Sequence, residues 1–176
     1  MILRLALLAL MLAGSAGAQP VPEPDGFRGE PYRAPVPETL QGAVVIGAAQ
    51  AVALHKQGVP FIDAMPRQKR PEGLPAGTIW NAKPHHTIPG AVWLFDTGYD
   101  RISAKEQDRL ATGLSRATSG DKAAPMVIFC KADCWMSWNA AKRAVALGYT
   151  GVNWFPEGSD GWVAAGGDLV TAEPAQ

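Results

Sequence analysis

The amino-acid sequence predicts an α/β fold: a single domain with a mainly parallel sheet flanked by helices. Short apolar runs alternate along the chain with longer segments of helical periodicity, which is typical of strands joined through helices. Residues 125–129 are apolar at successive positions, as in a central parallel strand that is covered on both faces. Gly58 and Gly148 directly follow two of the helical segments, where glycine commonly ends a helix.

The strands and helices expected in the first part of this domain alternate along the chain. We expect strands at residues 43–46, 60–63 and 88–94, and helices at 48–57 and 103–116. Ser103 and Glu106 form a capping-box pattern where the second of these helices begins. Residues 65–86 contain several prolines and no sustained periodicity, so they are predicted to form a long loop, which in a compact domain is usually functional.

The second part of the domain continues the same alternation. We expect a polar turn at 118–124, strands at 125–129 and 152–155, a helix at 138–147 and a turn at 156–161. The sequence therefore predicts one domain over residues 43–170, followed by a short tail at 171–176.

Two segments precede the predicted domain. Residues 1–18 have one positive charge, an apolar run too short to span a bilayer, and a small-residue end at Ala16-Gly17-Ala18, which is the pattern of a cleaved secretory signal peptide. Residues 19–42 are rich in proline and are predicted to form an extended arm or linker. We therefore expect a periplasmic or secreted protein with no membrane span after signal cleavage.

The charge balance excludes some classes of partner. Lysines and arginines number 16 and aspartates and glutamates also number 16, so the formal net charge is zero. A nucleic-acid partner is not expected, because no basic field is present to attract a polyanion. Two cysteines are also too few for a disulfide scaffold, so the core must come from apolar packing.

Both cysteines lie in the stretch Val-Ile-Phe-Cys-Lys-Ala-Asp-Cys-Trp-Met-Ser-Trp, residues 127–138. Three interpretations are open: a structural disulfide, a metal site, and a reactive thiol with a second thiol that resolves it. Cys130 follows an apolar strand and precedes a helix, which places it at the carboxyl edge of a parallel sheet, where ligands bind in open α/β folds. A helix N-terminus stabilises an anion and lowers the pKa of a thiol, so this setting favours a thiolate or a persulfide.

The order of several motifs resembles a rhodanese domain. These are Phe61-Ile62-Asp63, Ile88-Pro89-Gly90-Ala91, Val127 to Cys130 with its Ala-rich helix, and Gly158 to Trp162. The stretch Cys134-Trp135-Met136-Ser137-Trp138 further resembles a secreted branch of rhodanese-like proteins, named for a Cys-Cys-Trp motif and associated with pyrroloquinoline-quinone (PQQ)-dependent alcohol catabolism.

This resemblance implies roles for individual residues. Cys130 matches the nucleophile that carries a sulfane sulfur, and Asp63 matches the acid at the end of the second strand. The substrate-binding residues implied are those of the cysteine loop and its surroundings: Lys131, Ala132, Asp133, Trp135, Met136 and Ser137. Trp135 or Met136 stands where a substrate-binding arginine is usual, so Arg67 from the long loop is a candidate to replace that charge.

Cys134 is an addition to the usual rhodanese loop. It is expected to act as a resolving thiol that attacks a persulfide on Cys130 and closes a disulfide, or else to form an inert bridge that pins the loop. A sulfur donor or a thiol redox partner is therefore expected, together with a PQQ-dependent dehydrogenase system. No cofactor is predicted.

Two alternatives remain open. The first is a copper site formed by Cys130, Cys134, Met136 and His86, with His85 next to it, because soft sulfur ligands suit Cu(I). The second is a non-catalytic binding module that supports a PQQ-dependent alcohol oxidation system, with Trp135 lining a pocket or a partner surface.

Overall fold

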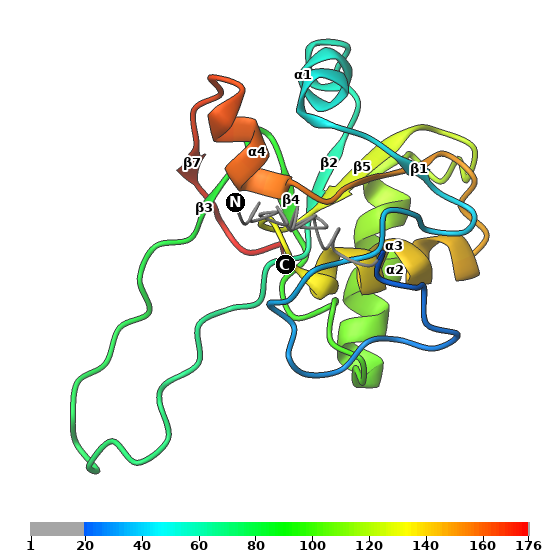
Figure 1. Ribbon diagram of the computed structural model, residues 1–176. Coiled ribbons are helices and arrows are strands. Elements are labelled where there is room, and N and C mark those ends of the chain that lie inside the picture. The colour runs from blue at the N-terminus through cyan, green and yellow to red at the C-terminus, as the bar shows by residue number, and fades with distance from the viewer. Residues whose placement is uncertain (1–19, 176) are drawn as a thin grey trace, which may run out of the picture.

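The computed structural model describes residues 20–175 and confirms the α/β fold. Five parallel strands form the main sheet in the order β1-β6-β5-β2-β4 (Figure 1). The strands of this sheet are β1 (Val44–Val45), β2 (Phe61–Asp63), β4 (Val92–Trp93), β5 (Met126–Phe129) and β6 (Val152–Phe155). The helices are α1 (Ala48–Lys56), α2 (Ala104–Ala117), α3 (Trp135–Ala146) and α4 (Gly158–Ala164).

The helices cover both faces of the sheet, with α2 and α3 on one face and α1 and α4 on the other (Figure 1). The sequence of the central strand β5 is apolar throughout because the strand is buried on both faces. Met126 and Ile128 point toward α2 and α3, whereas Val127 and Phe129 point toward α1 and α4. A strand buried in this way requires an apolar residue at every position.

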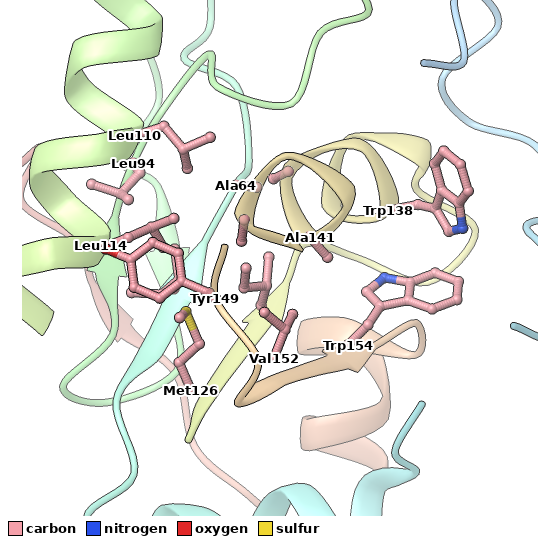
Figure 2. Close-up of a cluster of buried hydrophobic side chains, with 14 of the residues drawn as sticks. Ala64, Leu94, Leu110, Leu114, Met126, Trp138, Ala141, Tyr149, Val152 and Trp154 are labelled. Atoms are coloured by element: carbon pink, nitrogen blue, oxygen red, sulfur yellow. The ribbon is translucent and has the colours of Figure 1, made fainter. Parts of the chain in front are cut away.

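The main core lies between the sheet and the helices α2 and α3. Figure 2 shows Leu110 and Leu114 of α2 opposite Leu94, and Trp138 of α3 beside Trp154 of β6. Both tryptophans are fully buried, and their indole N–H groups donate to the Thr39 carbonyl and to Ser137 Oγ, respectively. This pairing satisfies the polar atom of each ring, which a buried indole requires.

The structure differs from the predicted elements in four main respects. The strand expected at 88–94 is limited to Val92–Trp93, because a turn with Gly90 at φ +77° precedes it. The turn expected at 156–161 leads instead into helix α4, and α3 begins at Trp135, three residues earlier than predicted. A small antiparallel sheet of β3 (His86–Thr87) and β7 (Val170–Thr171) was not predicted, because strands of two residues have no readable periodicity.

The Pro-rich segment is an extended arm that packs onto the domain, and it is not a free linker. Its residue Leu40 is only 3% exposed and joins the main core. The backbone N–H of Arg28 donates to Asn139 Oδ1 on α3, and the Asn139 amide donates back to the Arg28 carbonyl. Packing therefore begins ahead of residue 43, where the domain was expected to start.

The C-terminal residues also belong to the packed structure. β7 extends into the expected tail, Pro174 pairs with Trp93, and the N–H of Ala175 donates to the Trp93 carbonyl. Residues 1–18, expected to be a signal peptide, lie outside the described residues. Within residues 20–175, no helix has the length and apolar character needed to cross a membrane.

Candidate active site at the carboxyl edge of the sheet

Cys130 and Cys134 form a disulfide at the carboxyl edge of the sheet. Cys130 directly follows β5, and Cys134 is the N-cap residue of α3. Their Cα atoms are 6.2 Å apart, within the roughly 4.4–6.8 Å that a disulfide spans. Because Cys134 caps α3 and Cys130 is bonded to it, both sulfur atoms lie at the positive end of that helix.

The loop between the cysteines is held by α4 on one side. The Cys130 carbonyl accepts a hydrogen bond from the N–H of Ser159 at 2.9 Å, and Lys131 pairs with Gly158 in an isolated β-bridge. The N–H of Ala132 donates to Asp160 Oδ2 at 3.1 Å. The cysteine loop is therefore held in place by helix α4, which was not predicted from the sequence.

The arm holds the same loop from the other side. The N–H of Ala34 donates to the Asp133 carbonyl at 3.1 Å, and the N–H of Trp135 donates to the Tyr32 carbonyl at 2.9 Å. Asp133, which is exposed, adopts φ +51°, a left-handed conformation that aspartate tolerates better than most residues. The arm therefore acts as a strap across the cysteine loop.

The disulfide is buried among other sulfur-containing side chains. Cys130 and Cys134 are each 2% exposed and pack with Met136, Met65, Tyr32 and Tyr99. Met65 Sδ lies 3.3 Å from Cys130 Sγ. We refer to Met65, Cys130, Cys134 and Met136 as the sulfur cluster.

Two tyrosines border the sulfur cluster in their neutral form. Burial, together with a hydrogen bond to the Asp100 carboxylate, raises the pKa of Tyr32 to about 12. Burial and then the charge of Asp96 raise the pKa of Tyr99. Neither hydroxyl therefore ionises near neutral pH, so the two tyrosines add no negative charge beside the sulfur cluster.

Asp63 lies at the end of β2 and is 1% exposed. It accepts hydrogen bonds from Thr87 Oγ1 at 2.6 Å and from the N–H of Met65 at 2.8 Å, and its Oδ2 lies 2.7 Å from His85 Nε2. The His85 ring stacks on Trp93, with centroids 4.3 Å apart. Asp63 therefore positions Met65 and His85, and both of its carboxylate oxygens are used in these contacts.

Two cavities meet at the cysteine loop. The first, which we name the cysteine cavity, has a volume of about 470 Å³ and is bordered by Cys134, Met136, Tyr32 and Arg33. The second, the loop cavity, has a volume of about 670 Å³ and is bordered by residues that include Arg67, His85 and Asp160. Met65, Pro66 and Lys131 line both cavities and separate them.

The sequence matches the family model of the rhodanese-like domain over residues 48–165 of the 176. The chain belongs to the rhodanese family. A comparison with curated proteins gave no match. Sulfur transfer or thiol chemistry is the activity that family membership supports, and the cysteine pair follows the central strand of this rhodanese-like domain.

The predicted substrate residues of this rhodanese-like domain fall into different environments. Lys131 and Met136 border the cysteine cavity. Trp135 borders neither of these two cavities: it is 3% exposed, packs edge-on against Trp138, and donates from Nε1 to the Pro35 carbonyl of the arm. Ser137 is fully buried and donates to the Cys134 carbonyl at 3.0 Å, so its hydroxyl stabilises the start of α3.

Arg67 borders the loop cavity and not the cysteine cavity. Its backbone N–H and its Nε both face the Asp96 carboxylate, at 3.0 and 3.4 Å, and its guanidinium stacks on Phe95. The side chain is 51% exposed and borders the loop cavity. The cations next to the cysteine cavity are Lys131 and Arg33, of which Arg33 was not predicted because it belongs to the arm.

The expected copper set does not come together in this rhodanese-like domain. Both cysteines are bonded to each other, and His86 is exposed on β3, where it pairs with Thr171. It is His85 that turns inward, and it contacts Asp63. Within residues 20–175, no three side chains among His, Cys, Asp and Glu are grouped in a way that could hold a metal ion.

Sequence reasoning missed Met65 and the inward role of His85. Met65 follows the end of β2 by two residues, so it lies at the same edge of the sheet as the cysteine loop. This position along the sequence is the signal that could have revealed it. The pairing of His85 with Asp63 had no such signal, because the long loop separates the two residues in the sequence.

Proposed function

We propose that this rhodanese-like protein performs sulfur transfer or thiol redox chemistry, with Cys130 as the sulfur carrier and Cys134 as the resolving thiol. The observation that carries the proposal is the bonded pair Cys130–Cys134 at the N-terminal end of α3, next to a cavity of about 470 Å³. In the reduced state the helix dipole stabilises a thiolate at this position.

The reaction begins with the reduction of the disulfide. A dithiol partner supplies two electrons and two protons, and the partner itself becomes a disulfide. The Cys130 thiolate then attacks the outer sulfur of a persulfide donor, R–S–SH. A bond forms between Cys130 Sγ and that sulfur, the donor S–S bond breaks, and the thiol R–SH leaves.

Cys134 completes the cycle. Its thiolate attacks Sγ of the Cys130 persulfide, which forms the Cys130–Cys134 bond and releases HS⁻. The proximity of the two cysteines in the folded chain supports this step. A sulfur acceptor that attacks the persulfide before Cys134 does would instead receive the sulfur, so the two outcomes compete at one intermediate.

The charges around the cysteine cavity favour an anionic donor. Lys131 and Arg33 border the cavity, and Glu30 is the acidic residue beside them. A persulfide or another donor with a small negative group would gain from these cations, although both are accessible to solvent and the gain is reduced by screening.

The sharpest experiment compares Cys130→Ser with Cys134→Ser. Each reduced protein is incubated with a persulfide donor, and the mass of the cysteine peptide and the released sulfide are measured. We expect Cys134→Ser to trap one extra sulfur on Cys130 without releasing sulfide, because no resolving thiol is present. We expect wild type to release one sulfide for each disulfide formed.

Cys130→Ser serves as the matched control, since it retains one thiol in the same loop. It should show neither the adduct nor sulfide release. An adduct on Cys134 in this variant, together with none on Cys130 in Cys134→Ser, would reverse the two roles. The absence of an adduct in every reduced protein would refute the proposed sulfur transfer.

We also propose a periplasmic location and a partner in PQQ-dependent alcohol oxidation. The signal-peptide pattern of residues 1–18 supports the location, and the resemblance of Cys134-Trp135 and its neighbours to the Cys-Cys-Trp branch supports the partner. Cell fractionation of the full-length chain tests the first, with recovery in the cytoplasm as the contrary result. Alcohol-dependent growth of a deletion strain tests the second, and unchanged PQQ-dependent oxidation would contradict it.

A further inference from the structure

The sulfur cluster brings four soft ligands into one buried site. Met65 comes from the end of β2, Cys130 from the end of β5, and Cys134 and Met136 from the start of α3. Met65 Sδ and Cys130 Sγ are 3.3 Å apart, and Met136 packs in the same cluster at 4% exposure. The elements thus converge on one point at the carboxyl edge of the sheet.

We propose that the reduced protein binds one Cu(I) ion through Cys130, Cys134, Met65 and Met136. Thiolate and thioether sulfurs are soft ligands that select Cu(I) over harder ions. Metal–sulfur bonds of about 2.3 Å place two ligands of one ion roughly 3–4 Å apart, depending on the angle at the metal. The separation of Met65 and Cys130 agrees with this geometry before any movement of the loop.

Reduction of the disulfide must precede binding. A dithiol transfers two electrons and two protons to Cys130–Cys134, and is itself oxidised to a disulfide. Cu(I) then binds the two sulfurs as thiolates, and two protons leave for solvent. The resulting site has one net negative charge, which Lys131 and Arg33 at the adjoining cavity partly balance.

The surroundings argue for a soft ion and against a hard one. In the part of the chain that the structure describes, His, Cys, Asp and Glu form no group of three suitable for a metal. Both carboxylate oxygens of Asp63 already have partners in Thr87, Met65 and His85. The harder divalent ions therefore lack oxygen ligands, and zinc lacks the further thiolate or imidazole ligands that complete its usual set of four.

The test is a Cu(I) titration of the reduced full-length protein under anaerobic conditions, in competition with a chromophoric Cu(I) chelator. Wild type should remove one equivalent of copper from the chelator. Met65→Leu and Met136→Leu should each weaken binding by at least the roughly 10–100-fold that loss of an outer-shell partner costs at a metal site. Met126→Leu is the matched control, because Met126 is fully buried in the main core and outside the sulfur cluster.

Two results would overturn the proposal. Wild-type affinity in both Met65→Leu and Met136→Leu would show that the dithiol alone binds copper. Failure of the reduced wild type to compete with the chelator would show that no specific site exists. The persulfide assay on wild type and on Met126→Leu distinguishes a failed copper site from a failed sulfur transfer, because sulfur loading of Cys130 requires no copper. Thermal unfolding checks that Met65→Leu and Met136→Leu fold.

Discussion

His85 Nε2 and Asp63 Oδ2 are 2.7 Å apart, although 22 positions separate the two residues along the chain. This contact closes the long loop between β2 and β3 and fixes both ends of it at the carboxyl edge of the sheet. The same carboxylate accepts from Thr87 and from the Met65 backbone. Asp63 is therefore the point that joins β2, β3 and the sulfur cluster.

Asp63→Asn should destabilise the fold. An amide NH₂ group would face donors that now point at a carboxylate oxygen, and hydrogen bonds to a buried charged group contribute about 1.5–3 kcal/mol each. We expect the free energy of unfolding, measured with urea, to fall by at least this amount. Asp108→Asn, on the exposed face of α2, should change it by less than about 0.5 kcal/mol. Equal effects of the two substitutions would contradict the central position of Asp63.

Ala34→Pro should make the disulfide easier to reduce. Proline removes the N–H that Ala34 donates to the Asp133 carbonyl, so the arm is held less firmly over Cys130 and Cys134. We expect faster reduction by dithiothreitol, followed by alkylation of the released thiols and mass spectrometry. Ala34→Gly retains the N–H and should reduce at a rate much closer to wild type. A wild-type rate in Ala34→Pro would show that the arm does not limit access.

Tyr32→Phe should change how stability depends on pH. The folded state raises the pKa of Tyr32 from 10.0 to about 12, so its contribution is fully present below pH 10 and is lost as the pH rises from 10 toward 12. The difference in urea midpoint between wild type and Tyr32→Phe should therefore be constant from neutral pH to pH 10 and decrease above pH 10.

The same variant affects Asp100 at acid pH. Its hydrogen bond from Tyr32 lowers the pKa of Asp100, which adds stability above the ordinary carboxyl pKa that is lost as the pH falls. Tyr32→Phe should therefore raise the pKa of Asp100, which NMR titration of the carboxyl carbon can measure. Tyr149→Phe, in the main core, is the control. An unchanged Asp100 titration in Tyr32→Phe would contradict the pairing.

Gly158→Ala should disturb the cysteine loop. Gly158 has φ +54°, and an added Cβ would lie 2.4 Å from the Cys130 carbonyl oxygen and 2.7 Å from its carbon. Overpacking against backbone costs about 1–3 kcal/mol, to which the strained conformation adds. We expect a lower urea midpoint and a lower yield of the Cys130 persulfide. Gly26→Ala, whose Cβ would meet open space, should match wild type in both measurements.

The sequence predicted the features that depend on repeated apolar patterns. β5 and α2 were recognised because burial on both faces of a strand, and on one face of a helix, leaves a periodic signal. The position of Cys130 at the end of β5 followed from the same pattern. These parts of the site could be placed without knowledge of any tertiary contact.

The remaining parts of the site depend on contacts between distant segments. Trp135 was expected in a pocket, but the arm covers it, and nothing local in the proline-rich sequence indicates where that arm docks. Arg67 was expected near the cysteines, yet it pairs with Asp96, which is 29 positions away. Helix α4 begins with glycine, serine and aspartate, which favour turns and have low helix propensity, so local signals predicted a turn at a place where the fold forms a helix.

Two hydrogen bonds fix the backbone of Met65 to neighbouring residues, so the position of its thioether does not depend on the loop that follows. Its N–H donates to Asp63, and its carbonyl accepts from the Trp93 indole at 2.6 Å. The residues beyond it extend away from the body of the domain before the chain returns at β3 (Figure 1). Shortened or exchanged loops could therefore be grafted between Pro66 and Pro84 to reshape the loop cavity while the cover of the disulfide stays in place.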